Sequence, residues 1–223
     1  MSVLLNRYTG SVLLQNHPNP LLRYGGKVWS QNDEDGLTFE ILRRIGITTG
    51  VFGEFGVGNG VENNTLALAA LGWSGYWVGG DDLAFDTNPG RSARPNFCYQ
   101  KAWVTADNVL PLHEQALGLI GQSRCDLISM DLDGNDYYFV DKLLSSGATP
   151  TVFIVEYNAR FIPPIRFIID YDDNHQWTGD DYFGASLAGY ADLFRKHEYF
   201  LRAINGVKST TARAPSAQVM ATV

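Results

Sequence analysis

The segment 51-VFGEFGVGNGVENNTLALAALG-72 joins a short apolar run to a helical pattern through a glycine-rich turn that follows Glu54. Glycine permits a tight turn and a close approach of a ligand to the backbone, and the first N–H groups of a helix are unpaired. The segment therefore predicts a strand, a ligand-binding turn and a helix that begins near residues 61–63. The glycines of the turn are Gly56, Gly58 and Gly60.

The rest of the chain alternates strand-like apolar runs with patterns of helical spacing. Helical spacing occupies 33–45, which is followed by Gly46, and recurs at 109–120 and 183–194. Strands that alternate with helices favour a parallel sheet covered on both faces, because a parallel connection has to cross back over the sheet. We therefore expect an α/β fold. The strand-like runs are 49–55, 75–79, 97–104, 125–131, 151–157, 198–204 and 216–223.

Length and composition are those of one globular domain. The chain has 223 residues, of which 45% are hydrophobic and 18% charged, so disordered and fibrous classes are excluded. We expect residues 1–32 to form an N-terminal arm that packs on a domain spanning 33–223. The net charge of −7, from 17 basic and 24 acidic residues, argues against partners such as nucleic acid or an anionic membrane surface.

The cysteines and the N-terminus indicate the compartment. Cys98 and Cys125 lack zinc-ligand spacing, which excludes a thiol-rich metal site and indicates reduced thiols. No apolar run is long enough for a secretory segment or a membrane span. We expect a cytoplasmic protein. A homodimer is compatible with the sequence, although no feature requires one.

The spacing of the glycine turn separates the classes of ligand. A dinucleotide fingerprint has a third glycine where this chain has Asn63, and a phosphate-binding P-loop has a lysine that is absent here. A carboxylate at Glu54 would repel a pyrophosphate but attract the ammonium and sulfonium groups of S-adenosylmethionine. The turn therefore favours S-adenosylmethionine. The plainer alternative is a structural glycine turn beside a solvated glutamate.

Four segments together resemble class I, Rossmann-like S-adenosylmethionine-dependent methyltransferases, and among them the FkbM-related and neighbouring bacterial sugar or natural-product methyltransferases. The resemblance covers about residues 30–205. It implies a Rossmann-like three-layer sandwich whose seven-stranded, mostly parallel sheet has an antiparallel last strand, with HEYFLRAIN and SAQVMATV as the closing hairpin. The segments that carry it are EFGVGNGVENNT, DLISMDLDGND, VFIVEYN and YFGASL.

The resemblance also implies where the cofactor would bind. Glu54 would contact the methionine amine, and the backbone of the glycine turn would lie against the cofactor. An acid that ends the second strand would bind the ribose hydroxyls. In 75-GYWVGGDD-82 that position is glycine, so the role would fall to Asp81 or Asp82. Thr105, Ala106 and Asp107 would lie near the adenine, with Asp107 as an alternative helix cap.

Acidic side chains follow the fourth and fifth predicted strands. Because parallel sheets bind ligands at the carboxyl ends of their strands, these residues would face the reacting methyl group. Asp131 or Asp133 could take the proton from an acceptor hydroxyl. Alternatively, Asp131, Asp133, Glu156 and Asn158 could hold Mg²⁺, as acids and an amide do in the metal-dependent methyltransferases that these strand ends resemble. Some of these residues could also cap helices.

The segment 158–182 shows no apolar periodicity, and so long a loop is usually functional. It contains His175, which could act as a general base or be a solvated loop residue, and aromatic rings that could stack on a substrate. The sequence thus predicts an S-adenosylmethionine-dependent methyltransferase that O-methylates a small-molecule acceptor, a sugar or a natural product. The alternatives are a catalytically inactive binding protein of the same fold and an NAD-dependent oxidoreductase.

Overall fold

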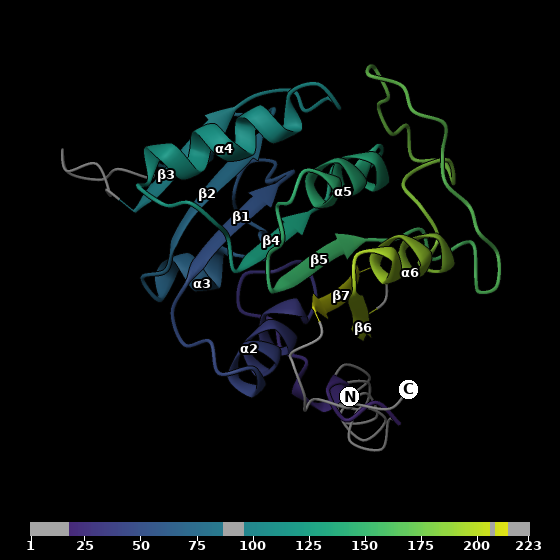
Figure 1. Ribbon diagram of the computed structural model, residues 1–223, viewed down its shortest axis with the longest axis horizontal. Coiled ribbons are helices and arrows are strands. Elements are labelled where there is room, and N and C mark those ends of the chain that lie inside the picture. Colours follow the sequence, from purple (N-terminus) through teal and green to yellow (C-terminus); the bar gives the residue numbers. More distant parts are fainter. Residues whose placement is uncertain (1–17, 87–95, 206–207, 214–223) are drawn as a thin grey trace, which may run out of the picture.

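The computed structural model describes residues 18–86, 96–205 and 208–213. Its single seven-stranded sheet has the order β3-β2-β1-β4-β5-β7-β6 (Figure 1). Strands β1 to β5 are parallel, and β7 is antiparallel to both β5 and β6. The predicted Rossmann-like sheet with an antiparallel last strand is confirmed. The strands are β1 Val51–Phe55, β2 Ser74–Gly79, β3 Phe97–Lys101, β4 Leu127–Met130, β5 Val152–Glu156, β6 Tyr199–Asn205 and β7 Lys208–Arg213.

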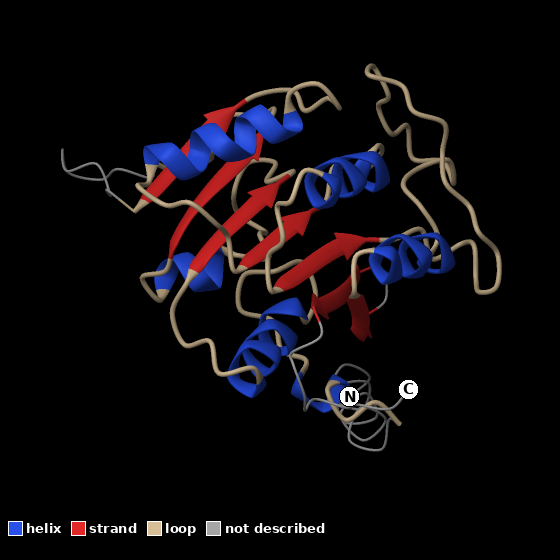
Figure 2. Cartoon of the chain, in the orientation of Figure 1, coloured by secondary structure: helices blue, strands red, loops and turns tan. Residues whose placement is uncertain are grey.

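Helices lie on both faces of the sheet, which gives three layers (Figure 2). The helices α4, α5 and α6 pack on one face, whereas α2 and α3 pack on the other. None of the helices in the described residues has the length and apolar character needed to cross a membrane. The helices are the 3₁₀ turn η1 Leu22–Tyr24, α2 Glu34–Arg44, α3 Leu66–Ala70, α4 Val109–Leu119, α5 Asp136–Ser145 and α6 Leu187–Lys196.

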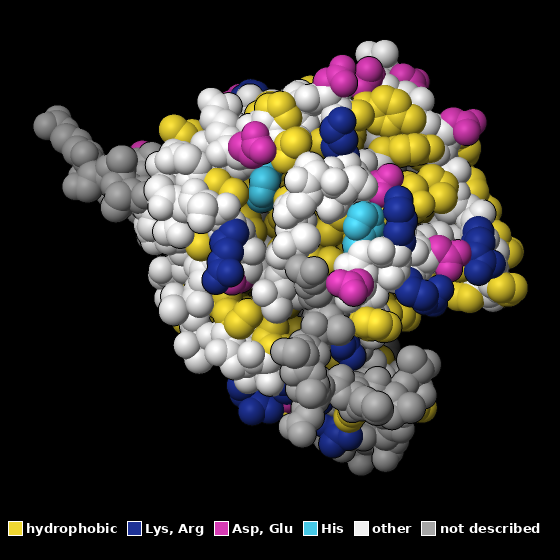
Figure 3. All heavy atoms as spheres, in the orientation of Figure 1, with side chains coloured by type: hydrophobic (Ala, Val, Ile, Leu, Met, Phe, Trp, Pro, Cys, Tyr) yellow, Lys and Arg dark blue, Asp and Glu magenta, His cyan; other side chains and the backbone are white. Residues whose placement is uncertain are grey.

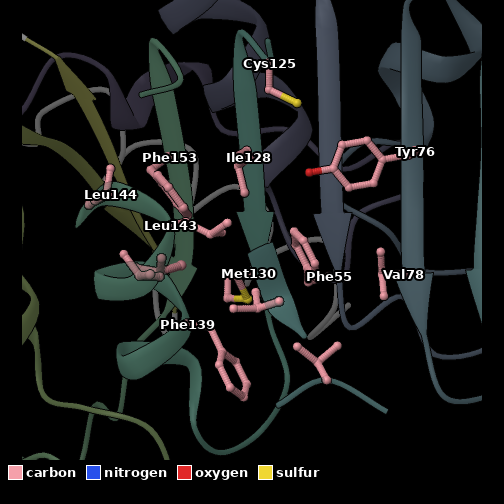
Figure 4. Packing of buried hydrophobic residues seen from close by; sticks show 14 of the residues in the cluster. Phe55, Tyr76, Val78, Cys125, Ile128, Met130, Phe139, Leu143, Leu144 and Phe153 are labelled. Atoms are coloured by element: carbon pink, nitrogen blue, oxygen red, sulfur yellow. The ribbon is translucent and has the colours of Figure 1, made fainter. Parts of the chain in front are cut away.

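Alternate residues of the central strands supply two separate cores. In β4, Ile128 and Met130 pack in the cluster beneath α4, α5 and α6, whereas Leu127 faces the cluster of α2 and α3. Figure 4 shows Phe139 of α5 beside Met130, with Phe55 of β1 close by. Because successive side chains of a strand point to opposite faces, a strand covered on both sides has to be apolar throughout. This explains the continuous apolar runs in the sequence.

Two predicted helices begin at other residues in the structure, and one strand was not predicted. The helix after the glycine turn begins at Leu66 rather than at 61–63, because the preceding backbone is bonded to Glu54 instead. Phe183 lies outside α6, which begins at Leu187 after the N-cap Ser186, whose hydroxyl accepts a hydrogen bond from the backbone N–H of Gly189 at 3.2 Å. Strand β7 was not predicted, and the predicted run 216–223 lies outside the described residues.

Strand β7 was missed because its sequence is polar. It contains Ser209, Thr210 and Thr211, which are all buried. Threonine is β-branched and fits a pleated strand as well as valine does, so hydrophobicity alone underestimates such a segment.

Candidate functional site

A cavity of about 690 Å³ opens where β1, β2, β4 and β5 end. Its lining includes the glycine turn, the residues after β2, and the acidic strand ends that the sequence analysis singled out. Carboxyl ends of parallel strands are the usual ligand site of open α/β sheets. The lining residues are Gln31, Gly56, Val57, Gly58, Asn59, Val61, Glu62, Gly80, Asp81, Trp103, Asp131, Leu132, Asp133, Glu156, Trp177 and Phe183.

A larger cavity, of about 1010 Å³, lies at the opposite edge of the sheet. It is lined by residues such as Arg124, Pro150 and Phe200, which come before β4, before β5 and at the start of β6. No residue that the sequence analysis assigned to the ligand lines it. The smaller cavity at the carboxyl ends of the strands is therefore the candidate site.

The glycine turn forms one wall of the candidate site. Gly56 and Gly58 line the cavity and have positive φ angles of 85° and 47°. A Cβ atom on Gly58 would meet no atom within 4 Å, so this side of the turn is open to a ligand. Gly60 does not line the cavity, because its backbone packs against the side chains of Leu83 and Phe85. The predicted role of the turn thus rests on two glycines rather than three.

Glu54 is not among the residues that line the cavity, and its direct contact with the cofactor stays a prediction. Its side chain is buried and accepts hydrogen bonds from the backbone N–H groups of Asn64 at 2.8 Å and Thr65 at 3.0 Å. The Thr65 hydroxyl also donates to the Glu54 carboxylate and accepts from Trp77 Nε1 at 2.9 Å. These bonds satisfy N–H groups at the entrance to α3. Glu54 therefore fixes the backbone between the glycine turn and α3 through these hydrogen bonds.

Three carboxylates cluster at the ends of β4 and β5. Oxygen atoms of Asp131, Asp133 and Glu156 lie within 4.8 Å of one another. The loop after β4 is held by Asp136, whose carboxylate accepts from the backbone N–H groups of Leu132 at 2.7 Å and Gly134 at 3.0 Å. Burial raises the pKa of Asp136 to about 6, and the charge of Asp131 adds to this shift. The predicted acidic strand ends therefore meet at one point.

The lining of the cavity is strongly acidic. Five carboxylates line it, and none of its described lining residues is Lys, Arg or His. Asp81 lines the cavity, whereas Asp82 pairs with Lys101 at 2.7 Å and does not. One further acid of the lining, Glu62, forms an exposed ion pair with Lys27 at 3.3 Å. The five are Glu62, Asp81, Asp131, Asp133 and Glu156.

Asn158, which is predicted to be a metal ligand, lies outside the lining of the cavity. Its side chain is fully buried, and its Nδ2 donates to the backbone carbonyls of Asp181 at 2.9 Å and Phe183 at 3.0 Å. Its Oδ1 accepts from the backbone N–H of Arg160 at 3.0 Å. Asn158 thus joins the two ends of the segment 158–185, called the long segment below, which connects β5 to α6. Asn158 lies just after the end of β5, as predicted, but its amide is hydrogen-bonded to backbone groups of the same segment.

His175, which is predicted to be either a general base or a loop residue, does not line the cavity either. Its ring lies against Gly134, where a Cβ atom would come within 2.5 Å of His175 Cδ2. Its Nε2 atom is buried and has no hydrogen-bond partner among the described residues. The ring thus packs on the loop after β4 without access to the ligand space.

The residues predicted near the adenine also lie outside the cavity lining. The backbone N–H of Thr105 donates to Asn108 Oδ1 at 2.8 Å, and that of Ala106 donates to the Tyr171 hydroxyl at 2.7 Å. Asp107 does not cap α4, whose N-cap is Asn108. Asn63 is buried, and its amide has no hydrogen-bond partner in the described parts of the chain.

Aromatic residues close the cavity on the side of the long segment. The lining includes Trp103, which follows β3, and Trp177 and Phe183 from the segment 158–185. Figure 3 shows acidic and hydrophobic side chains together over that segment, at the upper right. Trp103 was missed by sequence reasoning, although an aromatic residue directly after a strand was the available signal. Phe183 was missed because its spacing fits the helical stripe of α6.

No protein-family model and no curated protein sequence matches this chain. Among solved structures, human N-acetylserotonin methyltransferase in complex with S-adenosylmethionine aligns with 10% identity and a TM-score of 0.40, over 73% of this chain and 47% of its own. An O-methyltransferase family 2 protein from Planctomyces limnophilus, in complex with apigenin, aligns with 12% identity and a TM-score of 0.42, over 96% of this chain and 61% of its own.

A third structure records the conversion of a disulfide bond into a thioacetal group during echinomycin biosynthesis. It aligns with 14% identity and a TM-score of 0.45, over 95% of this chain and 92% of its own. The chain therefore spans about half to three fifths of the length of the first two proteins. These similarities are too weak to assign a family or an activity, and the resemblance to FkbM-related enzymes stays a prediction.

Proposed function

We propose that the protein is an S-adenosylmethionine-dependent methyltransferase that transfers the methyl group to a hydroxyl of a small acceptor. The observation that carries the proposal is that the open glycine turn and five carboxylates line one cavity without a basic side chain. Such a lining favours a ligand with sulfonium and ammonium charges and repels the pyrophosphate of a dinucleotide. The sign of the charge thus argues against the NAD-dependent alternative.

The proposed cofactor residues lie at the ends of β1 and β2. The backbone from Gly56 to Asn59 would lie against the cofactor, and Asp81 would accept hydrogen bonds from its ribose hydroxyls. Glu54 would act indirectly, by fixing the turn through Asn64 and Thr65. The bound cofactor supplies a methyl group activated by the positive sulfur. Every other requirement of the reaction, namely position, exclusion of water and removal of a proton, falls to the protein.

The carboxylates at the ends of β4 and β5 would remove the proton. Oxygen atoms of three carboxylates lie within 4.8 Å of one another, and a carboxylate within hydrogen-bond reach of a hydroxyl can act as its general base. Asp131 or Asp133 would take the proton of the acceptor hydroxyl as its oxygen forms the bond to the methyl carbon. The pair of electrons of the broken carbon–sulfur bond stays on sulfur, so charge and atoms balance.

A divalent cation is the second use that this cluster fits. Carboxylate oxygens are the ligands that Mg²⁺ prefers, and the three side chains offer a donor set of the right type without Asn158. Asp131, Asp133 and Glu156 would hold the ion, which lowers the pKa of a hydroxyl bound to it. Titration of MgCl₂ into the wild-type protein and into Glu156→Gln, followed by calorimetry, tests this use. Equal heats for both proteins would remove the metal from the proposal.

Calorimetry with S-adenosylmethionine and S-adenosylhomocysteine tests the proposed function itself. We expect both to bind and NAD⁺ to give no heat. Asp81→Asn should weaken binding about tenfold or more, because one charge-assisted hydrogen bond is lost. Asp82→Asn is the matched control, since this neighbour pairs with Lys101 outside the cavity and should bind as the wild type does. Binding of NAD⁺ with no heat from either sulfur compound would overturn the proposal.

The alternative of a binding protein without chemistry is separated by turnover. Mass spectrometry of a reaction with S-adenosylmethionine and a library of hydroxylated small molecules should detect a product heavier by one methylene. Asp131→Asn and Asp133→Asn together should abolish that product while S-adenosylhomocysteine still binds. A protein that binds the cofactor but methylates nothing across broad libraries would favour the binding-only reading.

A further inference from the structure

The part of the cavity that remains for the acceptor has a distinct composition. The glycine turn and Asp81 are assigned above to the cofactor, and the rest of the lining includes the three clustered carboxylates and three aromatic rings. This division rests on the proposed function. The acceptor would therefore meet both negative charge and aromatic rings. The rings are those of Trp103, Trp177 and Phe183.

The two tryptophans present ring surface rather than hydrogen-bonding groups. Trp103 is 53% exposed and Trp177 is 48% exposed, although large apolar rings are usually covered. The Nε1 atom of Trp103 donates to the Asp173 carbonyl at 2.8 Å, and that of Trp177 donates to the Asp180 carbonyl at 2.8 Å. With both indole N–H groups used within the protein, the surface that these side chains offer to a ligand is ring carbon. Such a surface favours contact with another flat ring.

The carboxylates set the charge that an acceptor can carry. A negative group placed among Asp131, Asp133 and Glu156 would be repelled by all three carboxylates, and none of the described residues that line the cavity is Lys, Arg or His. A divalent cation and the cofactor, which has one net positive charge, would reduce this repulsion. The further charge of Asp81 lies in the same cavity, so the acidic excess remains.

From these two features we infer the acceptor class: a compound with a flat ring that is neutral or positively charged. Phosphorylated sugars, nucleotide-linked sugars and ring compounds with a carboxylate are excluded by the same charges. A hydroxyl on the ring would face the carboxylates while the ring lies against the indole faces. The acidic lining thus selects the acceptor by its charge, and the tryptophans select it by its flat shape.

Three probes with the same phenol ring and different charge test the inference. They are tyramine, which is cationic, 4-ethylphenol, which is neutral, and 4-hydroxyphenylacetate, which is anionic. Affinities are measured by ligand-observed NMR, without and with saturating S-adenosylhomocysteine. We expect tyramine and 4-ethylphenol to bind, and the anion to bind about tenfold more weakly or worse. High salt and the double variant Asp133→Asn, Glu156→Gln should both reduce this difference, because each weakens the repulsion.

The ring contact is tested with tryptophan variants. Trp177→Leu and Trp103→Leu should each weaken the binding of 4-ethylphenol severalfold. Trp29→Leu is the control, because Trp29 is 41% exposed but does not line the cavity. Equal or tighter binding of the anion, absence of binding by all three probes at millimolar concentration, or equal effects of the three tryptophan variants would each overturn the inference.

Failure of the inference and failure of the proposed function are distinguishable. If S-adenosylhomocysteine gives no heat but the three probes keep their order, the proposed function fails and the selection of ligands by charge stands. If S-adenosylhomocysteine binds and the order of the probes is absent or reversed, the acceptor class is wrong and the cofactor assignment stands.

Discussion

Gly56 and Asp131 follow neighbouring strands, and their backbones are in direct contact. A Cβ atom on Gly56 would lie 1.6 Å from the carbonyl oxygen of Asp131, a distance that two non-bonded atoms cannot adopt. The backbone N–H of Asp131 also donates to the carbonyl of Phe55 at 3.1 Å. The turn proposed for the cofactor and the acids proposed for the acceptor are therefore joined at this point. A change in one is expected to displace the other.

The first prediction concerns this contact. Gly56→Ala should destabilise the protein by about 3 kcal/mol or more, because it combines a clash with backbone and a left-handed φ of 85°. Gly58→Ala has a φ of 47° but no atom within 4 Å of the new methyl group, so about 1–2 kcal/mol is expected. That methyl group would occupy ligand space, and S-adenosylhomocysteine should bind more weakly. Urea denaturation and calorimetry measure both effects, and equal stability of the two variants would contradict the contact.

The second prediction concerns the hydrogen bonds behind the turn. Thr65→Val removes the hydroxyl that donates to Glu54 and accepts from Trp77, with little change in shape. Leaving buried polar atoms without partners should cost about 1–3 kcal/mol. Thr178→Val is the control, because its hydroxyl bonds only to Asp180 in an exposed loop. Urea denaturation of both variants tests the prediction, and losses of similar size would contradict it.

The third prediction concerns the long segment over the cavity. Asn158→Ala removes the amide that joins Arg160 to Asp181 and Phe183, so the segment should open more often. Trypsin should then cleave after Arg160 or Arg166 several times faster than in the wild type. Asn174→Ala, in the same segment, is the control, because within the described residues the Asn174 backbone N–H bonds to Asp172 but its side chain makes no hydrogen bond. An unchanged rate of cleavage in Asn158→Ala would show that the hydrogen bonds of Asn158 do not hold the segment closed.

The fourth prediction concerns pH. Burial raises the pKa of Asp136 from 3.8 to about 6, so the folded protein retains a proton that the unfolded chain releases. The free energy of unfolding that this group contributes is therefore highest below pH 4, falls as pH rises from about 4 to 6, and is constant above. The fall amounts to about 3 kcal/mol.

Asp136→Asn carries no titrating group at this position and should lack this fall. Urea denaturation of wild type and variant between pH 4 and pH 7 measures the difference. The free energy of unfolding of the wild type, relative to that of the variant, should fall as pH rises through this interval. A relative free energy of unfolding that grows with pH would contradict the raised pKa of Asp136.

The sequence by itself determined the sheet and the edge that carries the site. Apolar runs such as CDLISMDL alternate with helical patterns, and this alternation requires parallel strands with covered faces. Parallel strands end at one edge, so the glycine turn after β1 and the acids Asp131, Asp133 and Glu156 had to meet there. Those predictions needed only local pattern and the geometry of crossovers.

Only the tertiary structure decided which polar side chains face the ligand. Glu54 turned inward because backbone N–H groups before α3 needed an acceptor, and Asn158 was used by the ends of the long segment. Of two adjacent acids, Asp81 lines the cavity and Asp82 pairs with Lys101. Buried polar groups take the nearest partners that folding brings to them, and those partners come from segments far apart in the sequence.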